Sequence, residues 1–212
     1  MAGRDFQIAG DISSAAFFMV SAAVVNQSKI VHRDVLGNST RTGVARVLSR
    51  AGAGISTRLS DSKGPETSID FTVVHGPLRK FEVKKEELPS LIDEIPVLCV
   101  LATQADGASV IHDADELRVK ETDRINSMVS QLSKMGAAIK AAGNTLIING
   151  PTPLKGAVVN SFKDHRTAMS LIVAGMIAGG ETVVEDIECI DTSFPGFFDR
   201  LKALKVPFEL QG

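Results

Sequence analysis

Val47-Leu48-Ser49-Arg50-Ala51-Gly52-Ala53-Gly54-Ile55 returns in nearly the same form as Gln131-Leu132-Ser133-Lys134-Met135-Gly136-Ala137-Ala138-Ile139. A weaker third copy is Arg200-Leu201-Lys202-Ala203-Leu204-Lys205-Val206. In the first two copies a leucine-containing segment leads into a glycine and then into small and apolar residues. This order predicts a helix end, a tight turn and a strand start. The repetition indicates a chain built from internal repeats.

The elements predicted around these copies have the order strand, helix, strand, helix, strand, strand. We expect units at about 4–77, 78–150 and 151–212, packed as a single lobe over 1–212. The elements predicted for the first unit are 5–9, 13–26, 29–36, 40–51, 53–59 and 68–75. Those predicted for the second unit are 78–83, 91–105, 108–112, 121–135, 137–141 and 145–148. Those predicted for the third unit are 157–161, 164–178, 182–185, 194–204 and 207–210.

The first helix of each unit is apolar on most sides, and such a helix belongs in a core. The expected fold class is therefore α/β (α+β), with the repeated units around a pseudo-threefold axis, helices buried inside and sheets outside. Such symmetry brings equivalent helix starts together and would gather Asp93, Glu121 and residues 164–166 on one surface. The third unit lacks one strand. Either it is naturally clipped, or its last strand comes from elsewhere.

Five charged residues lie within Leu117-Arg118-Val119-Lys120-Glu121-Thr122-Asp123-Arg124, where a predicted strand leads into a predicted helix. A helix start attracts anions, because its first N–H groups are unpaired and its dipole is positive there. Lys120 and Arg124 are suited to hold a phosphate or carboxylate while Glu121 transfers protons. A capped, solvated helix start is the alternative for this stretch.

The composition indicates an ordinary globular protein. The 212 residues carry a formal charge of -2 and include no Trp or Tyr, which argues against a nucleic-acid partner. The longest apolar run, 15–25, is too short to span a bilayer, so no membrane partner is expected. Cys99 and Cys189 form no CxxC pair and fit a reducing, cytoplasmic setting.

Five blocks of the sequence resemble a known family in order and spacing. They are Gly10-Asp11-Ile12-Ser13-Ser14-Ala15-Ala16-Phe17-Phe18, Leu91-Ile92-Asp93-Glu94-Ile95-Pro96, the stretch 117–124, Asp164-His165-Arg166-Thr167-Ala168-Met169 and Thr192-Ser193-Phe194-Pro195. The chain resembles the carboxy-terminal lobe of the 3-phosphoshikimate 1-carboxyvinyltransferases (5-enolpyruvylshikimate-3-phosphate synthases), the glyphosate targets of aromatic amino-acid biosynthesis.

The resemblance implies that the enolpyruvyl group of phosphoenolpyruvate moves to the 5-hydroxyl of shikimate 3-phosphate, with release of phosphate. It implies no metal and no cofactor. Two lobes of the family enclose the substrates, and this lobe takes its remaining strand from the extreme amino terminus. The resemblance therefore implies that the partners are both substrates together with the amino-terminal lobe, and that the isolated lobe is inactive.

The resemblance also assigns catalytic residues. Glu121 matches the acid that protonates the methylene carbon of phosphoenolpyruvate. Asp93 matches the carboxylate that contacts the 5-hydroxyl, and it could also cap the helix that it precedes. His165 either assists proton transfer, binds phosphate or only fixes the turn.

Three further positions match substrate-binding residues of the family. Lys120 matches a contact to shikimate 3-phosphate, while Arg124 and Arg166 match the arginines that clamp phosphoenolpyruvate. At the position of Thr192 many relatives carry a lysine that contacts phosphoenolpyruvate, and threonine cannot supply that positive charge.

Two other functions remain open on the sequence. A stand-alone binding module for phosphate ligands could reuse this half fold. The transferase that acts on UDP-N-acetylglucosamine shares the fold and chemistry, although the stretches 117–124 and 164–166 fit the shikimate enzymes better.

Overall fold

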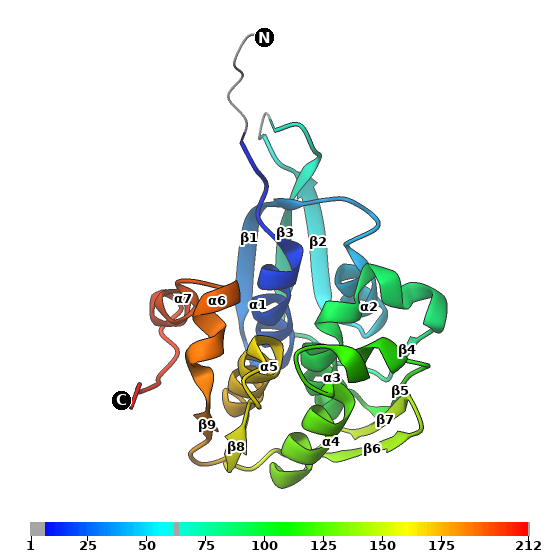
Figure 1. Ribbon diagram of the computed structural model, residues 1–212. Helices are drawn as coiled ribbons and strands as arrows, with labels where there is room; N and C mark the ends of the chain where they lie inside the picture. Colours follow the sequence, from blue (N-terminus) through cyan, green and yellow to red (C-terminus); the bar gives the residue numbers. More distant parts are fainter. Residues whose placement is uncertain (1–6, 62–63, 212) are drawn as a thin grey trace.

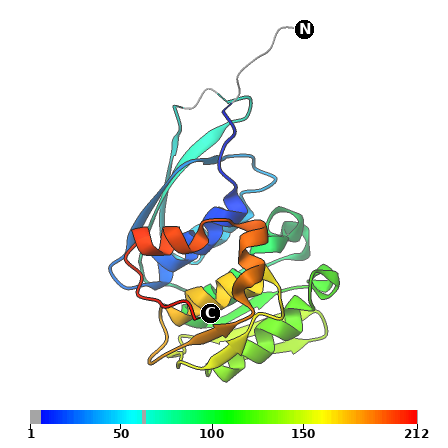
Figure 2. The same cartoon turned by 60° about the vertical axis from the view of Figure 1, so that its left-hand side comes forward.

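The computed structural model describes residues 7–61 and 64–211 of the chain. Within them the strands form three separate sheets, and the longest apolar helices lie on the inner side of these sheets (Figures 1 and 2). Among these residues, no helix combines the length and the apolar character needed to cross a membrane.

The first sheet has the strand order β1-β3-β2, and its pairings are all antiparallel. Its strands and accompanying helices are α1 (Ile12–Val24), β1 (Lys29–Leu36), α2 (Gly43–Arg50), β2 (Gly54–Leu59) and β3 (Ser68–Val74). Residues 5 and 6 of the predicted strand 5–9 lie outside the described residues, and 7–9 form no strand. Instead, Gly10 makes a parallel bridge to Val35.

The second sheet has the order β4-β5-β7-β6, with β4 parallel to β5 and the other pairs antiparallel. The predicted hairpin is confirmed, with Gly143 at a φ of 62° in its turn. The predicted strand 78–83 is reduced to its last two residues and a bridge between Arg79 and Asp106. The elements are β4 (Glu82–Val83), η1 (Lys85–Ser90), η2 (Ile92–Glu94), α3 (Ile95–Gln104), β5 (Gly107–Ile111), η3 (Asp115–Val119), α4 (Arg124–Lys134), β6 (Ala138–Ala142) and β7 (Thr145–Gly150).

The third sheet contains only the parallel pair β8-β9. The strand predicted at 207–210 is wrong, because no strand of the described chain pairs with this segment. Phe208 instead lies with its ring centre 5.6 Å from that of Phe198. The elements here are β8 (Val158–Asn160), α5 (His165–Gly175), β9 (Val183–Glu185), η4 (Ile187–Cys189), α6 (Ile190–Ser193) and α7 (Phe197–Ala203).

The repeated stretches share one turn geometry. After α2 and α4 the chain turns through Gly52 and Gly136 with φ of 87° and 89°, and after α7 it turns through Lys205 with φ of 58°. In each turn, the N–H that follows this residue donates to the carbonyl of the repeated leucine five positions earlier, over 3.0, 2.9 and 3.0 Å. This Schellman-like helix end explains why glycine occupies two of the positions.

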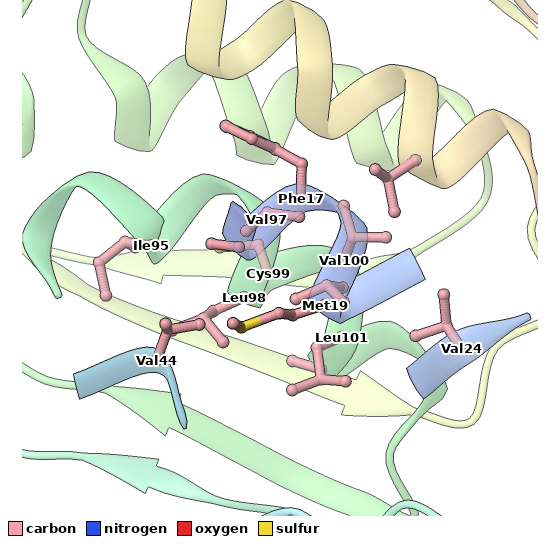
Figure 3. Close-up of a cluster of buried hydrophobic side chains, with 14 of the residues drawn as sticks. Phe17, Met19, Val24, Val44, Ile95, Val97, Leu98, Cys99, Val100 and Leu101 are labelled. Carbon is pink, nitrogen blue, oxygen red and sulfur yellow. The ribbon is translucent and has the colours of Figure 1, made fainter. Parts of the chain in front are cut away.

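The core forms where α1, α3 and α5 pack against one another. Every residue of α1 except Ser14 is buried, and Asp11 caps the helix by accepting the N–H groups of Ser13 and Ser14. Figure 3 shows side chains of α1 and α3, including Met19 and Cys99, gathered in one cluster. The predicted α/β class, with buried helices inside and sheets outside, is confirmed. Burial of each large apolar side chain in this core contributes about 1.5–3 kcal/mol to stability.

Candidate active site

Arg124 lies at the centre of a charged cluster, although it is almost fully buried, with 1% of its side chain exposed. It is the first residue of α4, whose N-cap Asp123 accepts the N–H of Asn126. The predicted helix start at Glu121 is therefore wrong, because the capping carboxylate fixes the start later in the chain. The segment before it is also no strand but the 3-10 helix η3, which buries Leu117 and leaves Val119 82% exposed.

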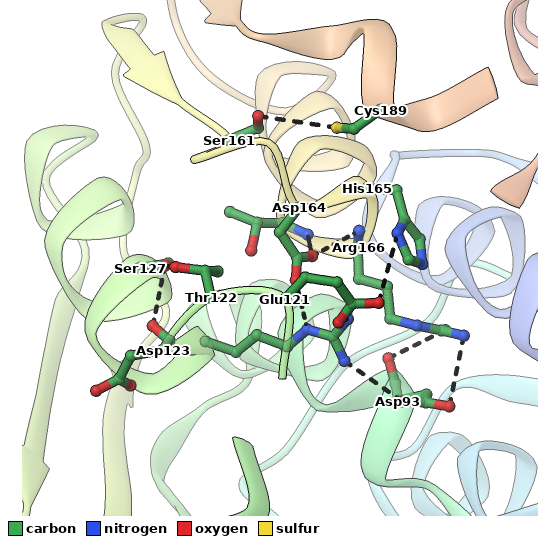
Figure 4. A network of polar contacts seen from close by, with 12 residues as sticks. Asp93, Glu121, Thr122, Asp123, Ser127, Ser161, Asp164, His165, Arg166 and Cys189 are labelled. Atoms are coloured by element: carbon green, nitrogen blue, oxygen red, sulfur yellow. Dashed lines mark hydrogen bonds and ion pairs between the residues drawn. The ribbon is translucent and has the colours of Figure 1, made fainter. Parts of the chain in front are cut away.

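Three carboxylates surround the Arg124 guanidinium. Its Nε lies 2.8 Å from Asp164 Oδ2, its Nη2 lies 2.5 Å from Glu121 Oε2, and its Nη1 lies 3.4 Å from Asp93 Oδ1. In Figure 4 the side chains of Asp93, Glu121 and Asp164 lie close together in one polar cluster. These residues precede α3, α4 and α5, so the expected convergence of helix starts is present.

Asp164 is fully buried and has two structural tasks. Its Oδ1 accepts the backbone N–H groups of Arg166 and Thr167 at 2.8 and 2.9 Å, which caps α5. Its Oδ2 accepts from Arg124. Sequence reasoning assigned Asp164 no role at the site, although its place just before an apolar helix is the signal of a cap.

Arg166 lies beside this group on the first turn of α5 and is held more loosely. Its Nη2 lies 3.5 Å from Asp93 Oδ2, and its Nη1 donates to the Asp93 carbonyl at 3.3 Å. Asp93 thus contacts both arginines. It does not cap α3, because it lies inside η2 and Glu94 occupies the N-cap position.

His165 faces Glu121 across the cluster, with 3.9 Å between Nδ1 and Oε1. Burial and the positive charge of Arg166 lower the pKa of His165, while Asp164 and Glu121 act in the opposite direction. The net lowering favours a neutral imidazole, which can accept or donate a proton. Glu121 is the most exposed carboxylate of the group, with 48% of its side chain open to solvent.

The structure brings together five of the six predicted site residues and leaves Lys120 at the margin. Lys120 is half-buried just before Glu121, and no ion pair within the described chain joins it to the cluster. Thr192 donates its hydroxyl to the carbonyl of Cys189 at 2.6 Å and so stays within its own turn.

The arrangement suits an anionic ligand with a proton-transfer step. Arg124 and Arg166 offer planar forks that match phosphate or carboxylate oxygens. Beside them, Glu121 and His165 can exchange a proton with a bound group. A cavity of about 1040 Å³ lies elsewhere, along β9 and the segment after α7. The described residues that line it include apolar side chains, such as Ile172 and Phe198, and acidic ones, such as Glu181 and Glu185, but no arginine or histidine, so the charged cluster remains the candidate site.

Comparisons with known proteins identify the family of the chain. The family model of EPSP synthase (3-phosphoshikimate 1-carboxyvinyltransferase) matches residues 1–201. The 3-phosphoshikimate 1-carboxyvinyltransferase of Bacillus cereus (strain B4264) is 45% identical over 204 residues, which are 96% of this chain and 48% of that protein. The enzyme of that name from Bacillus anthracis (strain A0248) is 44% identical over the same shares.

Solved structures show the same relation. A structure of EPSP synthase from Acinetobacter baumannii superposes with a TM-score of 0.95 at 34% identity, covering 100% of this chain and 49% of that one. A second structure from this organism gives a TM-score of 0.93 at 32% identity. The chain spans about half the length of the curated relatives it matches. The chain belongs to the EPSP synthase (3-phosphoshikimate 1-carboxyvinyltransferase) family.

Proposed function

We propose that this chain forms the carboxy-terminal half of the active site of a 3-phosphoshikimate 1-carboxyvinyltransferase. The reaction moves the enolpyruvyl group of phosphoenolpyruvate to the 5-hydroxyl of shikimate 3-phosphate and releases phosphate. One observation carries the proposal: buried Arg124 and neighbouring Arg166 lie side by side among carboxylates from three helix starts. This pairs cations for an anionic substrate with groups for proton transfer.

In this proposal Arg124 and Arg166 bind phosphoenolpyruvate, whose carboxylate and phosphate both suit a guanidinium fork. The protonated Glu121 carboxyl donates its proton to the methylene carbon while the 5-hydroxyl oxygen adds to the adjacent carbon. A methyl proton is then lost and the C–O bond to phosphate breaks, which restores the enolpyruvyl double bond and releases phosphate. The contact of 2.5 Å between Glu121 and Arg124 means that an incoming anion competes with Glu121 for the same guanidinium. Substrate binding would thus release the carboxyl group that the chemistry needs.

The remaining roles concern the second substrate. Asp93 accepts a hydrogen bond from the 5-hydroxyl of shikimate 3-phosphate and takes its proton, and its contacts with both arginines hold the carboxylate in place. Half-buried Lys120 contacts the same substrate, and the neutral imidazole of His165 exchanges a proton with Glu121 once their separation of 3.9 Å closes to hydrogen-bond distance. Charge-stabilising contacts of this kind commonly lower an activation barrier by about 3–4 kcal/mol each.

We further propose that residues 1–212 are one lobe, made of units at about 4–77, 78–150 and 151–212. The shared turn after α2, α4 and α7 supports this division. The second lobe would supply the rest of the site, and a strand from the extreme amino terminus of the whole enzyme would occupy the cavity along β9. The free thiols of Cys99 and Cys189 favour a cytoplasmic location.

A phosphate-release assay with both substrates tests the function. The 212-residue chain alone should show no turnover above the uncatalysed rate. A mixture with the separately produced half of the Bacillus cereus relative that this chain does not match should restore it. Turnover by the chain alone at the rate of an intact relative would overturn the half-site proposal.

Calorimetry separates this function from a stand-alone binding module. The half-site proposal expects phosphoenolpyruvate to bind the chain alone only weakly, with a dissociation constant of about 1 mM or higher, which corresponds to roughly 4 kcal/mol of binding free energy. Micromolar binding by the chain alone would favour the module. Arg124→Gln should abolish binding in either case, whereas the surface variant Arg33→Gln should not.

A further inference from the structure

Glu94 is a buried carboxyl group directly behind Arg166, and the proposed mechanism leaves it unused. Only 3% of the residue is exposed. It occupies the N-cap position of α3, but its side chain makes no capping hydrogen bond. Its Oε1 lies 3.9 Å from Arg166 Nη1 and has no hydrogen-bond partner among residues 7–61 and 64–211.

Such a group is unfavourable unless its charge interacts with a neighbour. A buried carboxylate without compensation is destabilising, and a fold would gain from an apolar side chain there. Burial raises the pKa of Glu94, while the Ser13 hydroxyl, Arg166 and Arg41 act against this rise and Asp93 adds to it. Three of these groups come from other parts of the fold: Ser13 from α1, Arg41 from the loop before α2 and Arg166 from α5.

These groups form a chain that leads away from the site. Arg41, in the loop before α2, donates from Nη2 to the Ser13 hydroxyl at 3.2 Å. Ser13 lies in the first turn of α1 and is 2% exposed. Its hydroxyl favours the charged form of the Glu94 carboxyl, and Glu94 Oε1 in turn lies 3.9 Å from Arg166 Nη1. The order is thus Arg41, Ser13, Glu94, Arg166.

The two arginines of the site differ in how firmly they are held. Arg124 has a fully buried carboxylate, Asp164, at 2.8 Å that no ligand can reach. Among the described residues, the carboxylates paired with Arg166 are Asp93, at 3.5 Å, and Glu94, at 3.9 Å. When Asp93 turns to a substrate hydroxyl, Glu94 is the anionic partner that Arg166 keeps.

We propose that Glu94, held by Ser13 and Arg41, is a positioning residue that fixes the Arg166 guanidinium for anion binding. The inference rests on the proposed function in one respect, namely that Arg166 binds the substrate anion. The placement of Arg166 by Glu94 does not depend on that function, so the two can be tested apart.

The experiment follows the Arg166 Nε–Hε signal in the ¹⁵N-labelled 212-residue chain by NMR, with assignment from Arg166→Lys. Glu94→Gln keeps the size of the side chain and removes its charge. We expect exchange of the Arg166 Hε with solvent to accelerate about tenfold, the loss expected for one charge-assisted contact. Glu94→Asp, which keeps the charge, should restore part of the protection. The control Glu86→Gln changes an exposed acid and should leave the signal unchanged.

Ser13→Ala provides a second variant if Glu94→Gln does not fold, since it removes only one hydroxyl. It should accelerate the same exchange by a smaller factor. An unchanged Arg166 signal in a folded Glu94→Gln or Ser13→Ala chain would overturn the inference. Titration with phosphoenolpyruvate in the presence of the separately produced other half of the enzyme then tests the proposed function: if the signals of Arg124 and Arg166 do not respond in that mixture, the proposed function fails while the positioning result stands.

Discussion

Replacement of Asp164 by asparagine should destabilise the chain far more than the same exchange at another helix cap. The amide oxygen of Asp164→Asn can still accept the N–H groups of Arg166 and Thr167, so the cap of α5 survives. Its NH₂ group, however, would face the Nε–H of Arg124, where two donors meet. The substitution thus removes the ion pair with Arg124 while it keeps the helix cap.

The size of the expected loss of stability follows from the burial of this ion pair. Arg124 is 1% and Asp164 0% exposed, so the pair is fully desolvated. Breaking a buried pair by removing one partner costs about 3–5 kcal/mol. Because Glu121 and Asp93 still neutralise Arg124, we expect the lower end, about 3 kcal/mol. For a chain of this size that corresponds to a Tm lower by about 6–12 °C.

Urea unfolding followed by far-UV circular dichroism is the suitable assay, because the chain contains no Trp or Tyr for fluorescence. Asp11→Asn is the matched control: Asp11 caps α1 in the same way but contacts no buried cation, and asparagine is an equally good cap. The reasoning is refuted if the two variants lose the same stability within about 0.5 kcal/mol.

Three further predictions concern other parts of the fold. Burial lowers the pKa of His32 to about 4, so the neutral form is favoured in the folded chain and stability is lost as pH falls from 6.5 to 4. His32→Phe should remove up to about 3 kcal/mol of this loss, measured as the difference between unfolding curves at pH 7 and pH 4. Burial raises the pKa of Cys99 to about 12, so mass spectrometry after iodoacetamide should find Cys99 unmodified until the chain unfolds, with half-buried Cys189 reacting first. Phe197→Ala removes a fully buried ring 5.3 Å from that of Phe18 and should cost about 3–5 kcal/mol in the same urea assay; a loss below 1 kcal/mol would contradict its packing role.

The sequence predicted those parts of the fold that depend on local patterns. Periodicity placed α1, α3, α5 and most strands, and the repeated glycine marked the turns at Gly52 and Gly136. The sequence did not predict elements whose conformation depends on a neighbouring strand or on a capping side chain. Residues 207–210 alternate like a strand, but a strand exists only beside another one. Likewise, the start of α4 depends on which of several acidic side chains caps it, and Asp123 does so.

At the site, the repeat indicated that helix starts converge, and the resemblance named the residues. The resemblance could not predict which role each of two neighbouring acidic residues has. Asp93 and Glu94 look alike in sequence, yet Asp93 is 27% and Glu94 4% exposed at the side chain. That difference arises from packing against Ser13 and Arg166, which are distant in the chain.

The position of Arg124 also has a consequence for folding. Its carboxylate partners lie as far apart in the chain as Asp93 and Asp164. The cluster therefore cannot assemble until these distant segments have docked. An anion that binds there therefore recognises only the completely folded chain, and its binding free energy adds to stability by RT ln(1 + [L]/Kd). Substrate would then act as a chemical chaperone, shifting the chain from partly docked intermediates toward the native state.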